Sequence, residues 1–286
     1  MADRRLLVRS VFSLLLLAPL AASAQAAAAD SPDIAPVKRA LALEVSAAQD
    51  TQHPMRYRLQ KSSPRFSSTK EIYETKDGGV ARLLETNGRS LNPADEQKEQ
   101  ARLETLLKDP SRQRHRKQSE DQDAARAIKV LGAFPSAFFF KFVGDGVGPS
   151  GKLEKFSFWP NPDFNPPDLE TQVLTAMAGE IWVDADQEHI VRLEGRLQQD
   201  VDFGWGILGR LNKGGSILIQ QAEVRSGRWR IVHFQLAMSG RVLFKTRSFD
   251  TEEQESQFEP LPVDLSYTQA IQMMRAGSDD AGKASR

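Results

Sequence analysis

The hydrophobic positions that follow residue 33 recur at helical spacing and then change to strand spacing. Apolar residues three or four positions apart predict an amphipathic helix over 34–48. These residues are Ile34, Val37, Leu41 and Val45. The stretches MRYRLQKSS, TKEIYETKDGG and VARLLETNGRSL then read as short strands, with Asp-Gly at 77–78 and Asn-Gly at 87–88 as turns. The pattern therefore predicts a helix followed by an antiparallel meander.

A charged helical insert is predicted over about 92–131. Asn92 and Pro93 provide a cap and a first-turn proline for a helix that should stop before Pro110, and a second helix is expected over about 121–131. The basic run between them could contact phosphates; its members are Arg112, Arg114, His115, Arg116 and Lys117. However, eight acidic and eight basic residues lie within 95–126, which favours a solvated charged surface.

The remaining chain has mostly strand patterns, which fill most of 137–249. AFFFKFVG and KLEKFSFWP are aromatic strands, whereas PNPDFNPPD must be a loop because proline lacks the N–H that a sheet needs. Asp168 can cap a short helix that runs to Met177, and a hairpin turn is expected at 184–187. Strands follow strands without crossover helices, so the sheet should be antiparallel.

The stretch DVDFGWGILGRLNKGG, residues 200–215, contains G-x-G-x-x-G at Gly204, Gly206 and Gly209. A dinucleotide site needs a helix directly after the glycines, but SILIQQAEV is another strand pattern. Asp200 and Asp202 share one face of a strand, so a catalytic carboxylate pair is an alternative to solvated charges beside Arg196. The favoured interpretation is a strand bent by glycines.

Other candidate chemistry is sparse. The four histidines, His53, His115, His189 and His233, lack metal-ligand spacing, there is no cysteine, and no G-x-S-x-G elbow occurs. We therefore expect no metal and no cofactor. The tryptophans could line the floor of a binding cavity or belong to an ordinary core; they are Trp159, Trp182, Trp205 and Trp229.

The first residues have the pattern of a secretory signal peptide. Arg4, Arg5 and Arg9 precede the apolar run 11–20, and small residues end at Ala24. The sequence thus predicts a signal peptide over 1–24, export to the periplasm and a flexible segment over 25–35. The absence of cysteine excludes a lipoprotein anchor, and the net charge of zero gives no indication of a nucleic-acid partner.

Three stretches together resemble the periplasmic lipoprotein-carrier superfamily of LolA and LolB, and in particular its secreted branch. They are GEIWVDADQEHIVRLEG, DVDFGWGILGRLNKGG and GRWRIVHFQLAMSGRVLFK. The resemblance covers about 36–262 and implies an α+β fold, in which helices cover a strongly curved, unclosed antiparallel sheet with an apolar cavity for acyl chains. The charged insert departs from a minimal carrier, and RAGSDDAGKASR indicates a partly disordered tail within 263–286.

These patterns predict a non-enzymatic periplasmic protein of the cell envelope that binds an amphiphilic or lipid-like ligand. The apolar faces of two strands should line the cavity, with the residues Val191, Leu193, Leu197, Val201, Phe203, Val232, Phe234, Leu236 and Met238. An acyl-chain ligand and a monomer are expected, and contact with a membrane surface is left open. An envelope scaffold that acts through its sheet surface, or a hydrolase with an unrecognised site, are the alternatives.

Overall fold

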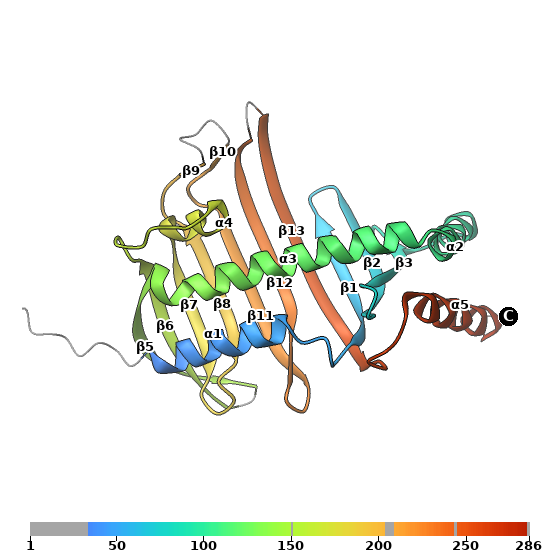
Figure 1. The fold of residues 1–286 in the computed structure, drawn as a ribbon, viewed down its shortest axis with the longest axis horizontal. Helices are drawn as coiled ribbons and strands as arrows, with labels where there is room; N and C mark the ends of the chain where they lie inside the picture. The colour runs from blue at the N-terminus through green and yellow to red at the C-terminus, as the bar shows by residue number, and fades with distance from the viewer. Residues whose placement is uncertain (1–33, 150, 204–208, 243–244, 285–286) are drawn as a thin grey trace, which may run out of the picture. The chain divides into compact units, whose positions relative to one another are not determined.

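The computed structural model of the protein describes residues 34–149, 151–203, 209–242 and 245–284 (Figure 1). The predicted signal peptide lies outside the described residues. The first half of the chain forms α1 (Ala35–Ala48), β1 (Met55–Ser63), β2 (Phe66–Tyr73), β3 (Val80–Thr86), β4 (Arg89–Ser90), α2 (Pro93–Lys108) and α3 (Pro110–Ala137).

The second half is mostly strands. Its elements are β5 (Phe138–Gly148), β6 (Gly151–Pro160), α4 (Leu169–Gln172), the 3-10 helix η1 (Val173–Ala176), β7 (Met177–Asp184), β8 (Ile190–Leu197), β9 (Val201–Phe203), β10 (Gly209–Leu211), β11 (Ser216–Arg225), β12 (Arg228–Val242), β13 (Lys245–Pro260) and α5 (Tyr267–Ala284).

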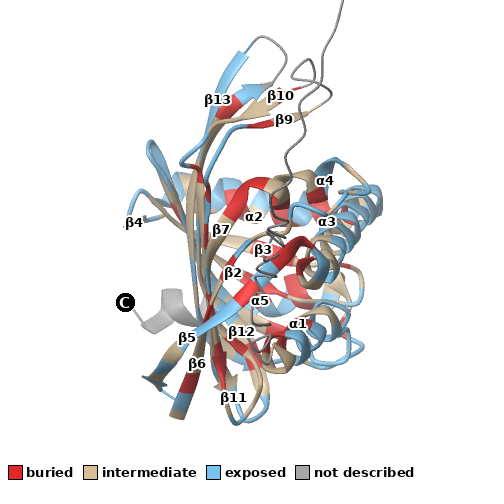
Figure 2. Cartoon of the chain, turned by 90° about the vertical axis from the view of Figure 1, so that its left-hand side faces the viewer, coloured by how far each residue is buried: buried red, intermediate tan, exposed pale blue. Residues whose placement is uncertain are grey.

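All strands of the described residues belong to one antiparallel sheet of 13 strands. The strand order is β4-β3-β2-β1-β13-β12-β11-β8-β7-β6-β5, with β10 and β9 attached beside β12. The sheet does not close on itself, because β4 and β5 stand at its two ends. Helices α1, α3 and α4 lie on one side of it (Figure 2). The predicted α+β class, with an unclosed antiparallel sheet covered by helices, is confirmed.

A first hydrophobic cluster fills the space between β5–β8 and the helices. Phe156, Phe158 and Ile181 on the sheet are 0–1% exposed, and they pack with residues of α1 and with Phe134 near the end of α3. The spacing of Val37, Ala40 and Leu41 within the predicted first helix places them on one face, which is the face that α1 buries here. This cluster is the main core of the described residues.

A second, smaller cluster lies at the β3 end of the sheet. Leu103 and Leu106 of α2 pack there with Ile271 and Met274 of α5 and with Val80 of β3. The segment 263–286 was expected to be a tail, yet α5 begins at Tyr267 within it, and Ile271 is completely buried. The predicted domain boundaries remain predictions.

The second helix of the charged insert begins earlier than predicted. It was expected to start at about residue 121, whereas α3 starts at Pro110 and runs without interruption to Ala137. The side chain of Asp109 accepts a hydrogen bond from the N–H of Ser111, and Pro110 occupies the first turn, so the start has an ordinary cap. Gln113 is 2% exposed and donates to the carbonyl oxygens of Asp77 and Gly78. The basic run therefore belongs to a helix, and the first turn of this helix is hydrogen-bonded to the loop that follows β2.

Strand β13 was also missed beyond Phe249, where the strand patterns were expected to end. It continues to Pro260 and pairs with β12 on one side and β1 on the other. Its sequence, KTRSFDTEEQESQFEP, has few apolar residues, so it shows no hydrophobic alternation. This polar strand joins the N-terminal meander to the C-terminal part of the sheet.

We expect Gly179→Ala to lower the free energy of unfolding by about 1–3 kcal/mol. A Cβ at Gly179 in β7 would overlap the carbonyl oxygen of Glu194, a backbone atom of β8 that cannot move aside without breaking the pairing. Gly132→Ala in α3 is the control, because apart from the surrounding backbone of its own helix no heavy atom lies within 4 Å of the added Cβ. It should stabilise the helix by about 0.5–1 kcal/mol. Chemical denaturation of both variants measures the difference, and equal effects would contradict the close approach.

Candidate functional site

The nine residues predicted to line a cavity divide into two groups. Leu193, Leu197 and Val201 are only 4%, 1% and 3% exposed, and they belong to the first hydrophobic cluster. Phe203 and Met238 are half-buried and pack against the same cluster. Beneath α1 and the end of α3, the protein's own side chains thus fill the space that the prediction assigned to an acyl chain.

The other predicted residues remain half-buried. Val232, Phe234 and Leu236 are half-buried on β12, and neither hydrophobic cluster includes them. Phe234 and Leu236 share one face of the strand, whereas Val232 lies at a register shift between β11 and β12. Val191, at the start of β8, is also half-buried and outside both clusters. The helix-facing side of β12 is therefore the part of the predicted cavity that the protein's own packing does not bury.

Charged side chains stand beside this apolar face, on β13 and β1. Phe234 is paired with Glu253, whose Oε1 lies 2.5 Å from Nζ of Lys61. Leu59 is paired with Glu255 on β13 and with Lys70 on β2. Because partners in an antiparallel sheet share a face, these groups lie on the same side as Phe234. The face is therefore apolar on β12, whereas β13 and β1 add the charged side chains Glu253, Glu255 and Lys61 to it.

Glu255 has the most perturbed carboxyl group of this face. Burial raises its pKa to about 7, and the nearby charges of Glu253 and Glu74 act in the same direction, against the opposing charge of Arg230. Burial also raises the pKa of Glu74, although Arg230 and the N–H of Met55 oppose that shift.

Helix α3 crosses over this part of the sheet (Figure 1). Glu120 on α3 accepts a hydrogen bond from the N–H of Gly79 at 2.8 Å, so the helix meets the meander here, and its charge contributes to raising the pKa of both Tyr57 and Glu74. Burial raises the pKa of Tyr57, whose ring stacks on Phe258 of β13 with ring centroids 5.4 Å apart. The half-buried part of β12 and the charged groups of β13 and β1 therefore lie on the α3 side of the sheet.

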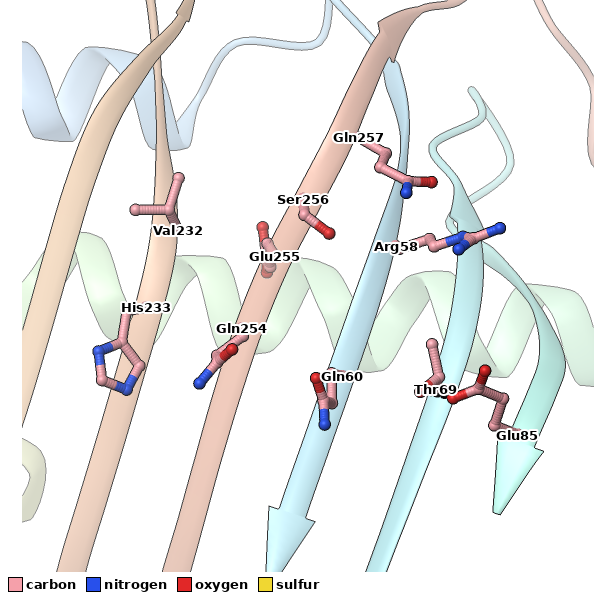
Figure 3. Close-up of a pocket in the computed structure, with 10 residues that line it drawn as sticks. All are labelled: Arg58, Gln60, Thr69, Glu85, Val232, His233, Gln254, Glu255, Ser256 and Gln257. Carbon is pink, nitrogen blue, oxygen red and sulfur yellow. Dashed lines mark hydrogen bonds between the residues drawn. The ribbon is translucent and has the colours of Figure 1, made fainter. Parts of the chain in front are cut away.

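The opposite side of the same strands has a polar hollow of about 450 Å3 (Figure 3). Pairing brings His233, Gln254, Gln60, Thr69 and Glu85 into one row across five strands. His233 Nε2 lies 3.0 Å from Glu252 Oε1, and Thr69 Oγ1 donates to Glu85 Oε2 at 2.9 Å. The hollow is also lined by Arg58, Ser256 and Gln257. Val232 and Glu255 contribute atoms to its wall as well, although the alternation along β13 directs the Glu255 side chain to the face opposite Gln254 and Ser256. Most of these polar groups are exposed or bonded to one another, so the hollow is open and wet.

The glycine stretch holds an ion pair. Asp202 Oδ1 lies 2.6 Å from Nε of Arg210 on β10, and Asp200 Oδ2 lies 3.4 Å from NH1 of the same guanidinium. The hydrogen bond from Arg210 lowers the pKa of Asp202. The cation beside the two carboxylates is therefore Arg210, whereas Arg196, which the sequence suggested, donates to the carbonyl oxygen of Gly214.

The glycines themselves are followed by strands. Gly209 begins β10, and β11 comes next, so no helix starts where a pyrophosphate would need one. Gly204, Gly206 and Trp205 lie outside the described residues.

The histidines stand in separate environments. His53 Nδ1 lies 2.6 Å from Asp50, His189 stacks on Trp229 with ring centroids 5.0 Å apart, and His233 contacts Glu252. Within the described ranges, no three His, Asp or Glu side chains are grouped as metal ligands would be. The helices of the same ranges include none that is long and apolar enough to cross a membrane.

Sequence reasoning missed the charged groups of the site, namely Glu253, Glu255 and Lys61. Glu253 and Glu255 belong to β13, the polar strand that shows no hydrophobic alternation. A signal for them was nevertheless present in the acidic run TEEQE, which begins at Thr251. This run directly follows a strand pattern and contains no glycine or proline to end it, so the strand had no reason to stop at Phe249.

Comparisons with known proteins give likeness in structure only. No family model matches the chain, and no curated protein matches it. A putative outer membrane lipoprotein-sorting protein domain from Vibrio parahaemolyticus has a TM-score of 0.29 and 11% identity, over 77% of this chain and 90% of that chain.

Two further solved structures are similar. A DUF1329 family protein from Desulfovibrio piger has a TM-score of 0.27 and 12% identity, over 81% of this chain and 95% of that chain. MucB, solved in complex with MucA(peri), has a TM-score of 0.20 and 12% identity, over 77% of this chain and 97% of that chain. These TM-scores are low, so the likenesses assign no ligand, activity or partner to this chain.

Proposed function

We propose that the protein is a non-enzymatic periplasmic protein that binds an amphiphilic or lipid-like ligand against the helix-facing side of β12. The observation that carries this proposal is the incomplete burial of Val232, Phe234 and Leu236. Leu193 and Leu197 on β8, which the same pattern predicts to line the cavity, are nearly inaccessible to solvent. Because the residues of β12 are less buried than those of β8, an apolar surface remains between the two hydrophobic clusters.

An amphiphile suits this surface because its acyl chain can contact the apolar side chains of β12 and its polar end can contact the charged side chains of β13 and β1. An acyl chain that covers the apolar side chains of β12 gains about 25 cal/mol per Å2 of buried area. The polar end then meets the charged groups of β13 and β1, which include Glu253, Glu255 and Lys61. Hydrophobic contact of this kind specifies the shape of the chain only weakly, so we expect micromolar affinity and broad tolerance of chain length.

We expect Phe234→Asp to weaken the binding of a neutral fluorescent acyl probe by about tenfold or more, since a charge would be placed where the acyl chain lies. The matched control is Gln235→Asp, which places the same charge on the same strand but on the opposite face and at an exposed position. Fluorescence titration of wild type and both variants, with circular dichroism to verify folding, gives the comparison. Absence of saturable binding by the wild type, or equal weakening by both variants, would contradict the proposal.

The periplasmic location rests on the N-terminal pattern of basic, apolar and small residues. We expect the exported protein to begin near Gln25. Intact-mass analysis of protein from an envelope fraction measures this directly, and a retained Met1 would contradict export with cleavage.

A hydrolase is a second candidate, because a carboxyl group with a raised pKa in a recess is typical of an acid or base catalyst. Glu255 is such a group. Turnover of p-nitrophenyl butyrate that is lost in Glu255→Gln would favour the hydrolase over the binding protein.

Exposed aromatic side chains on the outer face of the sheet support the scaffold alternative. Phe139 on β5 and Trp159 on β6 are 45% and 42% exposed and lie side by side at that end of the sheet. Exposed aromatic pairs of this kind occur at protein interfaces. If the wild type binds no fatty-acyl probe, this face becomes the better candidate.

A further inference from the structure

We propose that the ligand has a cationic polar end and that the carboxylate of Glu255 binds it. This inference rests on the proposed function, since it assigns a chemical class to the amphiphile that lies against β12. Glu255 would be the residue that distinguishes an ammonium-bearing amphiphile from an anionic or neutral one.

Glu255 differs from the acidic groups around it because it has no counter-charge in contact. Glu253 forms an ion pair with Lys61, and Glu74 accepts from the N–H of Met55 at 2.8 Å and from Arg230 at 3.3 Å. No hydrogen bond or ion pair joins the Glu255 side chain to another residue of the described ranges. Its immediate partner across β1 is Leu59, an apolar residue.

The surroundings of Glu255 make its charged form costly. The side chain is removed from much of the solvent, and an unpaired carboxylate in such a place loses hydration without gaining a partner. The charges of Glu253 and Glu74 add repulsion, and that of Arg230 opposes them. From α3, Glu120 adds a further carboxyl group that acts on the neighbouring Tyr57 and Glu74. A ligand cation at this position would relieve both the missing partner and the repulsion.

An anionic ligand would encounter the opposite situation. A fatty-acid carboxylate placed at the same end of the apolar face would meet Glu255 and Glu253 at short range, and like charges disfavour binding in a partly buried site. Lys61 is 52% exposed and already paired with Glu253, so it offers an anion little free charge. The geometry thus favours a primary amine or a quaternary ammonium group.

The test compares three competitors that share a twelve-carbon chain: dodecylamine, dodecanol and dodecanoic acid. Each displaces a neutral fluorescent acyl probe from the wild type, from Glu255→Gln and from Glu259→Gln at pH 8, below the micelle concentrations. Glu259→Gln is the matched control, because Glu259 lies on the same strand but is bound by Arg56 at 2.7 Å. Circular dichroism verifies the fold of each variant.

We expect dodecylamine to bind the wild type about tenfold more tightly than dodecanoic acid, as a charge-assisted hydrogen bond allows. Glu255→Gln should remove this preference and leave dodecanol unchanged, whereas Glu259→Gln should keep it. Equal binding of the three competitors, or a preference that survives in Glu255→Gln, would overturn the inference while leaving the proposed function intact. If none of the competitors and no probe binds the wild type, both are wrong.

Discussion

Phe158→Ala is expected to lower the free energy of unfolding by about 3–5 kcal/mol. Phe158 on β6 is 1% exposed, and its ring lies 4.7 Å from that of Phe138 and 6.0 Å from that of Phe134, between centroids. It therefore joins the end of α3 to the sheet. Removing the ring leaves a cavity that neighbouring side chains on a sheet can close only in part, and the lost contacts are not replaced by water.

The next residue along the chain provides the control. Trp159 is larger than Phe158 but 42% exposed on the outer face, so Trp159→Ala should cost less than about 1 kcal/mol. In thermal unfolding, the loss at Phe158 corresponds to a decrease in Tm of about 6–20 °C for a domain of this size. If both variants melted at the same temperature, the described filling of this end of the sheet would be wrong.

Glu255→Gln is expected to raise the free energy of unfolding by roughly 1–3 kcal/mol at about pH 8 and to have little effect at about pH 4. The pKa of Glu255 is raised from its ordinary value of 4.5 to about 7 in the folded protein, mainly by burial. Glutamine has a similar shape but no charge, so it avoids the cost of burying a carboxylate. The experiment is denaturant unfolding of wild type and variant at several pH values.

The direction of this effect follows from proton binding. Between pH 4.5 and about 7 the folded state holds a proton on Glu255 that the unfolded state has released. The contribution of Glu255 to stability therefore falls as the pH rises through this window, and it is constant above and below. The difference in the free energy of unfolding between variant and wild type should therefore increase over the same pH range.

Glu259→Gln should behave in the opposite way. The hydrogen bond from Arg56 lowers the pKa of Glu259, so its charged form is favoured in the folded protein. The free energy of unfolding of this variant should therefore not exceed that of the wild type at alkaline pH. If Glu259→Gln raised the free energy of unfolding as much as Glu255→Gln, the stabilisation would come from the general removal of negative charge and not from the burial of Glu255.

The sequence predicted the elements whose residues alternate or recur clearly. The helix expected over 34–48 and the strand MRYRLQKSS coincide closely with α1 and β1, because apolar spacing and turn residues delimit both. The start of α3 was misjudged, since its exposed charges hide the helical period and only Gln113 is buried near that end. Strand β13 was missed because its neighbours on both sides, rather than its own apolar residues, hold it in the sheet.

The candidate site was only partly predictable for a related reason. Alternation shows which face of β8 or β12 is apolar, but it does not show which helix covers that face. Leu193 and Phe234 follow the same pattern in sequence, yet α1 and the end of α3 cover the first and leave the second half-buried. The carboxyl group of Glu255 becomes notable only once β13 is placed between β12 and β1.

Helix α3 is attached at both of its ends. Near its start, Gln113 and Glu120 bind backbone groups of residues 77–79, and near its finish Phe134 is embedded in the main core before the chain enters β5. With 28 residues it is a rod of about 42 Å. A rod anchored at two points on one sheet does not swing aside as a hinged cover would. The distance between its middle and the sheet changes only when the strands between the anchors alter their twist, so this distance and the curvature of the central strands are mechanically one variable.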